Sequence, residues 1–282
     1  MARLEIKKAT YGGKDVTSIV KSKIHNDQLT LYVGNQTFGD PAPGTFKKLV
    51  LNINGTVRSF NENTYLSLPE TNKKKLGIWY SNNNVDKTVR ESVLNLQRFK
   101  DVADILTCVW RPIPGNPFYQ GIAMTQSSNH LNIIIQILQL LYTGRELGNY
   151  EYVSFLEHDV LYPDGYFDFP DFEGGVLTNM NYIGICNEGF QVKTANHEPL
   201  HQMTMRFTDA IQHFENLMKE AIRMGGVLVE PDVKRKQWNC DNPAIHINHG
   251  KHFTSHFSIY SKETTDHNPY WGDAKSLIEK VL

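Results

Sequence analysis

Cysteine is scarce in this chain of 282 residues, which contains only Cys108, Cys186 and Cys240. An odd number of cysteines at scattered positions argues against a disulfide framework. Two of them lie within apolar runs, so we expect buried, reduced thiols, and these favour a cytoplasmic location. No Cys-x-x-Cys pair is present, which argues against a structural zinc finger.

The chain also lacks long hydrophobic runs and an excess of charge of one sign. Its most apolar segment, residues 131–142, is too short to cross a bilayer, which requires about 20 apolar residues. Residues 1–8 show no secretory signal. The 29 basic and 30 acidic residues nearly cancel, which gives no electrostatic reason to expect nucleic acid or an acidic membrane as a partner. We therefore expect a globular cytoplasmic protein without a membrane span.

Residues 1–72 have the pattern of a small β domain. Short strand-like runs at 29–33 and 48–53 are separated by turn signals. Among these, Asn54-Gly55 is typical of a type I′ hairpin turn, which requires positive φ at both central residues. The patterns at 9–17 and 35–41 resemble the C-terminal β domain of DnaJ-like co-chaperones, and this resemblance implies a β module without a defined role.

Residues 73–282 show a different hydrophobic pattern. A polar segment at 69–75 separates the two patterns. Strand patterns alternate with helix patterns at 86–99 and after residue 127. The strand patterns lie at 76–80, 105–110, 152–156 and 182–186. This alternation predicts an α/β domain with a mainly parallel sheet flanked by helices.

Acidic residues stand directly after the predicted strand 152–156, in the triplet Glu157-His158-Asp159. In open α/β sheets, ligands bind at the carboxyl ends of the strands. Two carboxylates at such an end suit a hard divalent cation, Mn²⁺ or Mg²⁺, which can neutralise a leaving diphosphate. Triplets of this kind also arise by chance, so the prediction depends on the buried strand before it and the Pro163-Asp164-Gly165 turn behind it.

The run from Tyr152 to Pro163 resembles the Asp-x-Asp region of GT-A-fold nucleotide-sugar glycosyltransferases, with Glu-His-Asp as a variant of that motif. The resemblance implies a Rossmann-like GT-A domain. It implies that Asp159 ligates the metal and that Glu157 contacts the metal or the nucleotide. It also implies a nucleotide pocket at the end of the first strand, at Tyr80 and Ser81.

The activity implied by this resemblance is metal-dependent transfer of a hexosyl or pentosyl group to a hydroxyl acceptor. The donor would be a nucleotide sugar, with a UDP-sugar expected. The acceptor stays open between a glycan, a protein and a modified base of viral DNA. Two other functions stay open as well: a metal-dependent hydrolase that uses a histidine cluster, and an inactive module that binds carbohydrate or protein.

Four of the eleven histidines fall in one short segment, at positions 246, 249, 252 and 256. Imidazole is a good ligand for Mn²⁺ or Zn²⁺. GT-A enzymes often recruit a C-terminal histidine to the metal, with a glycine and a basic residue behind it. His249-Gly250-Lys251 matches this description, with His249 on the metal and Lys251 on the diphosphate, and His246 is the second choice. The alternative is that these histidines are ordinary surface or core residues.

His197 and His201 satisfy the His-Glu-x-x-His pattern of zinc proteases. That chemistry requires both histidines on one helical face, and Pro199 stands between them. Because proline is tolerated only in the first turn of a helix, we expect a helix that begins near Pro199 and ends before Gly225. This places His197 outside the helix and argues against a protease.

An inverting transfer needs a general base, usually a carboxylate. Glu188 and Asp241 lie in predicted loops, and Asp241 is preferred because Trp238 beside it could stack on a sugar. The alternative for each is a solvated loop carboxylate. Gln191, His201 and Arg206 are candidates to line the binding site of the acceptor. The sequence does not distinguish an inverting from a retaining reaction.

Overall fold

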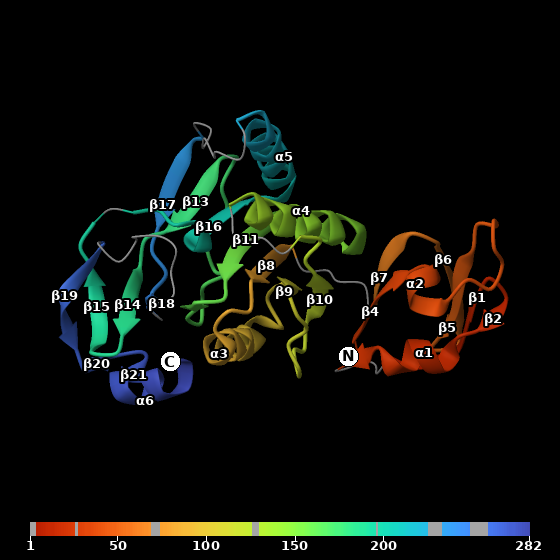
Figure 1. Ribbon diagram of the computed structural model, residues 1–282, viewed down its shortest axis with the longest axis horizontal. Coiled ribbons are helices and arrows are strands. Elements are labelled where there is room, and N and C mark those ends of the chain that lie inside the picture. Colours follow the sequence, from red (N-terminus) through yellow and green to blue (C-terminus); the bar gives the residue numbers. More distant parts are fainter. Residues whose placement is uncertain are drawn as a thin grey trace. The chain divides into compact units, whose positions relative to one another are not determined.

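The computed structural model describes residues 4–25, 28–68, 74–125, 130–195, 197–224, 233–248 and 259–282 (Figure 1). The chain divides into two compact units. The first comprises Met1–Asn72 with Thr143–Asn149, and the second comprises Lys73–Tyr142 with Tyr150–Leu282. Among the described residues, no helix is long and apolar enough to cross a membrane. All three cysteines are buried and free, as predicted.

The first unit contains two antiparallel sheets and two short helices. The larger sheet has the order β2 (Lys14–Asp15), β1 (Ile6–Tyr11), β5 (Lys48–Ile53), β6 (Thr56–Asn61). The smaller has the order β3 (Ile24–His25), β4 (Gln28–Val33), β7 (Thr64–Leu68). The helices are α1 (Thr17–Ser22) and α2 (Asn35–Phe38). Apolar side chains from both sheets form one core, which includes Tyr11, Leu29 and Leu49.

The hairpin predicted at Asn54-Gly55 is confirmed. Strands β5 and β6 pair in antiparallel register with Ile53 opposite Thr56. Asn54 and Gly55 have φ angles of 50° and 91°, which place both residues in the left-handed region. A two-residue turn of this kind matches the right-handed twist of the strands it joins, and asparagine followed by glycine adopts it at low cost.

The main sheet of the second unit has seven strands. Their order is β10 (Tyr119–Ile122), β9 (Asp104–Val109), β8 (Lys75–Ser81), β11 (Tyr152–Glu157), β16 (Met203–Arg206), β13 (Val176–Asn179), β17 (Arg235–Trp238). All neighbours are parallel except at β16, which is antiparallel to β11 and to β13. The predicted α/β architecture, a mainly parallel sheet flanked by helices and preceded in the chain by a small β unit, is confirmed.

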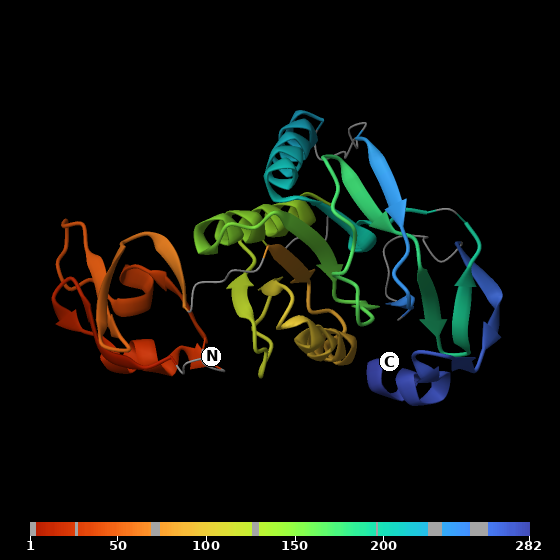
Figure 2. The ribbon, with the colours of Figure 1, turned by 180° about the vertical axis from the view of Figure 1, so that it is seen from behind.

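Helices cover both faces of this sheet. Helices α4 (His130–Leu147) and α5 (Phe207–Arg223) lie along one face, and α3 (Asp86–Leu96), continued by a 3₁₀ turn at Gln97–Phe99, lies along the other (Figures 1 and 2). Successive side chains of a strand point to opposite faces. On β11, accordingly, Phe155 contacts Phe214 of α5 at 5.0 Å between ring centroids, while Leu156 joins the core cluster that includes α3.

A second sheet of five strands completes this unit. Its order is β12 (Val160–Leu161), β18 (Ala244–Ile247), β14 (Tyr182–Cys186), β15 (Gly189–Lys193), β19 (Tyr260–Thr265). The remaining elements are the short pair β20 (His267–Asn268) and β21 (Gly272–Asp273) and the helix α6 (Ala274–Val281), which shares a core cluster with the five-stranded sheet. The predicted strand 182–186 therefore exists, but it belongs to this second sheet.

The helix expected to begin near Pro199 begins instead at Phe207. A 3₁₀ turn at Leu200–Gln202 follows Pro199, and residues 203–206 form β16. Pairing with β11 and β13 satisfies the backbone of this segment, and a pattern of local hydrophobicity does not reveal such long-range pairing. His197 and His201 do not share a helix, as predicted.

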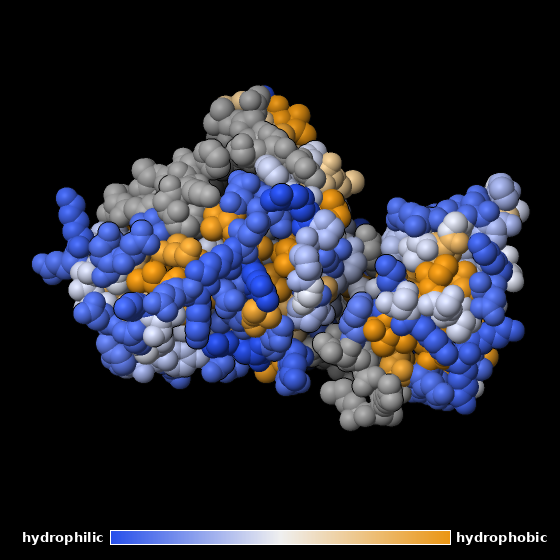
Figure 3. Space-filling model, turned by 60° about the horizontal axis from the view of Figure 1, so that its bottom comes forward, coloured by the Kyte–Doolittle hydropathy of each residue, from blue (hydrophilic) through white to orange (hydrophobic). Residues whose placement is uncertain are grey.

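The face of the described residues that Figure 3 shows is mostly hydrophilic, with separate apolar patches. Large apolar side chains that are exposed lie at scattered positions, among them Phe46, Val57, Met124 and Ile222. Scattered apolar residues of this kind are normal on monomeric proteins.

Candidate functional site

Four parallel strands of the main sheet end at the same edge. Strands β8, β9, β10 and β11 run in one direction, and Tyr80 on β8 pairs with Glu157 on β11. The carboxyl edge of an α/β sheet is where ligands bind, because the loops that follow the strands converge there. The predicted acidic triplet therefore lies at the end of a central strand.

Asn83 joins the loops that follow β8 and β9. Its side-chain oxygen accepts hydrogen bonds from the backbone N–H groups of Trp110 and Arg111, at 2.9 and 3.1 Å. Its amide nitrogen donates to the carbonyl of Arg111 at 3.1 Å. Asn83 has φ of 57°, a left-handed conformation that asparagine tolerates better than most residues. These bonds hold the loop after Ser81 against its neighbour.

Glu157 is held by side chains from three segments. The Tyr80 hydroxyl donates to Oε1 at 2.7 Å, and Nδ1 of His201 lies 3.3 Å from Oε2. The backbone N–H of Glu157 donates to the hydroxyl of Tyr162 at 3.0 Å. The Glu157 side chain is 25% exposed, so its carboxylate is anchored and still reaches solvent.

Asp159 is positioned by the pairing of β12 with β18. Val160 pairs with His246, and the N–H of Ile247 donates to the carbonyl of Asp159 at 2.7 Å. This register places Nε2 of His246 3.5 Å from Oδ2 of Asp159. The Asp159 side chain is 9% exposed. Asp159 and His246, which lie 87 positions apart in the chain, thus lie close together.

The surroundings keep both carboxylates ionised. Burial opposes ionisation of Glu157, but the hydrogen bond and charge of His201 outweigh it, and the pKa of Glu157 lies below its ordinary value. Burial also opposes ionisation of Asp159, yet the hydrogen bond of His246 and the charges of His158 and His246 hold its pKa well below the usual range. Burial and the Glu157 carboxylate raise the pKa of Tyr80, which therefore stays a hydrogen-bond donor.

The two imidazole rings contact one another. Their centroids are 4.9 Å apart, with an angle of 51° between the ring planes. Hydroxyl groups of Tyr162 and Tyr166 donate to the carbonyl of His201 at 3.1 and 3.2 Å and hold its 3₁₀ turn against the end of β11. The result is a buried cluster in which each carboxylate faces its own histidine.

The donor set suits a hard divalent cation. Mg²⁺ is usually held by one or two carboxylates together with substrate phosphates, and Mn²⁺ also accepts oxygen ligands. Glu157 and Asp159 supply two ionised carboxylates at the ligand-binding edge. Within the described ranges, no group of three or more His, Cys, Asp or Glu side chains is arranged to hold a metal ion. The predicted ligand His249 and the predicted diphosphate contact Lys251 lie outside the described residues.

The two predicted catalytic carboxylates lie at opposite ends of one pair of strands. Strands β14 and β18 are parallel. Asp241 is exposed in the bend before β18, and Glu188 is exposed in the turn after β14. Because Ile247 at the end of β18 contacts the backbone of Asp159, Glu188 shares the end of these strands nearest the acidic pair.

The other candidates for the acceptor side are also separated. Gln191 on β15 pairs with Gly184, in the same cross-strand row as His246. Arg206 pairs with Tyr152 at the beginning of β11, which is the opposite end of that strand from Glu157. Of the three residues, His201 contacts the acidic pair directly.

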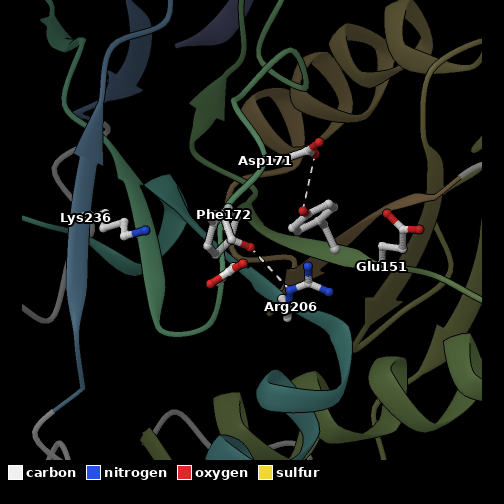
Figure 4. A pocket seen from close by; sticks show the side chains of 7 residues that line it. Glu151, Asp171, Phe172, Arg206 and Lys236 are labelled. Atoms are coloured by element: carbon white, nitrogen blue, oxygen red, sulfur yellow. Dashed lines mark hydrogen bonds between the residues drawn. The ribbon is translucent and has the colours of Figure 1, made fainter.

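A polar cavity of about 390 Å³ lies at this opposite end (Figure 4). Arg206 donates from Nε to the carbonyl of Phe172 at 3.3 Å, and the hydroxyl of Tyr152 donates to Asp171 at 3.3 Å. Glu151 and Lys236 also line it. The cavity is at the amino end of β11, where α/β sheets do not form their ligand sites.

Sequence reasoning does not identify three residues that support the site. Asn83, Gly184 and Tyr260 act through contacts with segments far from them in the chain. Tyr260 bonds to His246, and its ring lies against Gly184. Only the positive φ of Asn83 has a local signal, because asparagine is favoured there, but the Asn82-Asn83-Asn84 run does not indicate which residue adopts it.

No family model matches the chain, and no curated protein matches it. Solved structures that it resembles include the glycosyltransferase GlyE of Streptococcus pneumoniae TIGR4, with a TM-score of 0.39 and 8% identity over 59% of this chain and 45% of that one. A glycosyltransferase involved in glycosylation of the major capsid of PBCV-1 has a TM-score of 0.38 and 8% identity, over 65% of this chain and 95% of that one.

The galactosyltransferase LgtC, in complex with donor and acceptor sugar analogs, has a TM-score of 0.33 and 11% identity. The match covers 55% of this chain and 66% of that one. This chain thus spans less than half the length of GlyE and about two thirds of LgtC. At such low TM-scores, the resemblance by itself assigns no activity to this chain.

Proposed function

We propose that this protein is a glycosyltransferase that moves a sugar from a nucleoside diphosphate sugar to a hydroxyl acceptor with the help of a divalent cation. The observation that supports this proposal is the pair Glu157 and Asp159. Both carboxylates lie at the carboxyl edge of parallel strands, and their surroundings keep both ionised.

In this proposal Asp159 and Glu157 would hold Mn²⁺ or Mg²⁺, and the bound cation would supply positive charge to the leaving diphosphate. Ser81 ends β8 beside this pair, so the nucleotide lies along the loop that Asn83 holds in place. Tyr80 keeps one oxygen of Glu157 in a constant position. The residues thus orient the donor and its leaving group before any bond changes.

During transfer, the acceptor oxygen bonds to the anomeric carbon, the bond from that carbon to the diphosphate breaks, and the acceptor loses a proton. If the reaction inverts the anomeric configuration, a carboxylate takes that proton. Glu188 is better placed for this role than Asp241, because it shares with Asp159 the carboxyl end of β14 and β18.

The proposal is tested by calorimetric titration of UDP and GDP into the protein, with and without Mn²⁺. We expect binding of a nucleoside diphosphate that depends on the metal, and loss of that binding in Asp159→Asn and Glu157→Gln. Asp101→Asn is the control, because Asp101 is an exposed carboxylate in the same unit. Circular dichroism establishes that each variant is folded.

Other outcomes distinguish the alternatives. Stoichiometric zinc in the purified protein, with no response to nucleotides, would favour a metal-dependent hydrolase. No response to metal or nucleotide would favour a binding module without activity. Metal-dependent nucleotide binding that is undiminished in Asp159→Asn would remove the acidic pair from the proposal. The acceptor is then sought by release of nucleoside diphosphate from a UDP-sugar in the presence of glycans, proteins or hydroxymethylated DNA.

A further inference from the structure

The residue that ends β8 is buried and bonded within the chain. Ser81 is only 1% exposed. Its hydroxyl accepts from the backbone N–H of Asn83 at 2.9 Å, and its carbonyl accepts from the buried amide of Gln136 at 3.3 Å. These bonds occupy the hydroxyl and the carbonyl of Ser81, so contacts with a ligand fall to exposed residues of the neighbouring loops.

Arg111 is an exposed residue of the loop that follows β9, and Asn83 holds it by bonds in both directions. Oδ1 of Asn83 accepts from the N–H of Arg111 at 3.1 Å, and Nδ2 donates to the carbonyl of Arg111 at 3.1 Å. In return, Nη2 of Arg111 donates to the carbonyl of Asn83 at 3.0 Å. Asn83 is 5% exposed, so these bonds fix Arg111 to a buried part of the carboxyl edge.

Further bonds hold the rest of this loop. Oε1 of Gln120 accepts from the N–H of Ile113 at 2.8 Å. Nδ2 of Asn116 donates to the hydroxyl of Thr107 at 2.9 Å, and its side-chain oxygen accepts from the N–H of Phe118 at 3.0 Å. A loop ordered in this way loses little conformational freedom when a ligand binds, which favours affinity.

Most of the Arg111 guanidinium can meet a ligand, because the side chain is 69% exposed. Nη2 lies 3.9 Å from the exposed Asp86, and so long an ion pair in solvent contributes little. Nε and Nη1 form no hydrogen bond or ion pair with the residues that the structure describes. A guanidinium only donates, and its N–H groups form a rigid planar fork that matches acceptor atoms in one plane.

The sheet places this loop to one side of the acidic pair. Cys108 on β9 pairs with Tyr80, and Tyr80 pairs with Glu157. Because adjacent strands are about 4.8 Å apart, the backbone of Cys108 lies about 10 Å from that of Glu157. The buried His201 lies on the other side of Glu157. A nucleotide bound by its diphosphate at the acidic pair can thus extend toward β9, which brings its base to the loop of Arg111.

The four bases differ in the groups that they present to such a donor. Uracil carries a carbonyl oxygen at C4, and guanine carries one at C6 beside the acceptor N7. Cytosine and adenine carry an amino group at these positions. A guanidinium has no acceptor for the hydrogens of an amino group, so it favours uracil over cytosine and guanine over adenine.

We infer that Arg111 is a specificity-determining residue of the proposed donor site, where it recognises the carbonyl edge of uracil or guanine, and that Asn83 positions it. The inference rests on the proposed function and deepens it, because it restricts the donor to a uridine or guanosine diphosphate sugar. A bidentate contact between a guanidinium and a base edge discriminates between bases by about 10-fold or more.

The test is calorimetric titration of UDP, CDP, GDP and ADP into the full chain with saturating Mn²⁺. We expect the unaltered protein to bind UDP about 10-fold more tightly than CDP, and GDP more tightly than ADP. Arg111→Met keeps an unbranched side chain but has no N–H donor. In this variant the preference should disappear through weaker binding of UDP and GDP, while the affinities for CDP and ADP stay unchanged.

Two variants serve as controls. Arg90→Met removes an exposed arginine from α3, and Asp86→Asn removes the long ion pair of Arg111. We expect both to keep the base preference, and circular dichroism establishes that each variant is folded. An equal loss of affinity for all four nucleotides in Arg111→Met would show that Arg111 contacts the phosphates. An unchanged preference would show that it contacts neither part. Either result would overturn the inference.

Asn83→Gly tests the positioning of Arg111. Glycine adopts a positive φ at low cost but lacks the three side-chain bonds to Trp110 and Arg111. We expect a weaker base preference with an unchanged affinity for Mn²⁺, and a full preference would exclude Asn83 from this role. If the unaltered protein binds none of the four nucleotides, the proposed function fails and this inference fails with it. Binding without a base preference would overturn this inference alone.

Discussion

Each unit of the chain contains a partly buried cluster of charged side chains, and the two clusters differ in how completely their groups are paired. In the first unit, the side chain of Lys47 is only 4% exposed. It lies 3.1 Å from Asp40 and 3.5 Å from Glu62, and it donates to two carbonyl oxygens. Glu62 in turn accepts from the Tyr11 hydroxyl and from the N–H of Lys47.

The cluster in the second unit is less completely paired. The side chain of Glu157 is 25% exposed, and Nε2 of His201 has no hydrogen-bond partner in the part of the chain that the structure describes. A buried network whose members are all bonded stabilises one conformation, whereas open donor and acceptor sites are available for a ligand. The comparison favours a structural role for the Lys47 cluster and supports the binding role that we propose for the acidic pair.

The largest expected effect on stability is that of Lys47→Ala. Removal of one partner from a buried ionic network leaves the others uncompensated, and we expect a loss of about 3 kcal/mol in the first unit. Hydrogen exchange of the β1 and β5 amides measures it. Lys48→Ala, which changes the exposed lysine that follows Lys47 at the start of β5, is the control.

Tryptophan fluorescence tests whether this loss stays in the first unit. All four tryptophans, at positions 79, 110, 238 and 271, belong to the second unit. We expect their unfolding midpoint and the binding of nucleotide and Mn²⁺ to be unchanged in Lys47→Ala. An equal shift of the fluorescence midpoint would show that the two units unfold together and would break the comparison.

A smaller effect is expected from Ser92→Ala in the second unit. Nε1 of the buried Trp79 donates to the Ser92 hydroxyl at 3.1 Å, and that hydroxyl lies within hydrogen-bond distance of the carbonyls of Glu157 and Val160. Loss of one buried hydrogen bond should cost about 1–2 kcal/mol. The fluorescence midpoint in urea measures it, with the exposed Arg90→Ala on the same helix as control. Equal unfolding midpoints in the two variants would show that Ser92 does not stabilise the segment from Glu157 to Val160.

The smallest expected effect is a loss of stability of the first unit at acid pH. The hydrogen bonds of Tyr11 and of the Lys47 backbone hold the pKa of Glu62 below its ordinary value of 4.5. Its contribution to stability is therefore complete above about pH 4.5 and is lost as the pH falls through the lower pKa of the folded state. Hydrogen exchange of β5 across this range measures it. Glu62→Gln should have a flatter profile, and an identical profile would exclude Glu62 as the cause.

Local patterns predicted many individual elements. The runs at 76–80, 105–110 and 152–156 are strands β8, β9 and β11, and the pattern at 86–99 is α3 with its 3₁₀ turn. The predicted helix from near Pro199 is wrong at residues 203–206, which form strand β16. Met203, Thr204 and Met205 are buried because the segment is a strand between two others, and an apolar run of this length suits a strand or a buried helix equally well.

The amino-acid sequence by itself determined where the acidic pair lies, because a strand pattern and the triplet after it are local features of neighbouring residues. Only the tertiary structure decided what surrounds each carboxylate. His201 and His246 reach Glu157 and Asp159 from segments that are distant in the chain, through the 3₁₀ turn before β16 and the pairing of β12 with β18. Such neighbours depend on how whole sheets pack, and the periodicity of side chains along a single segment contains no information about them.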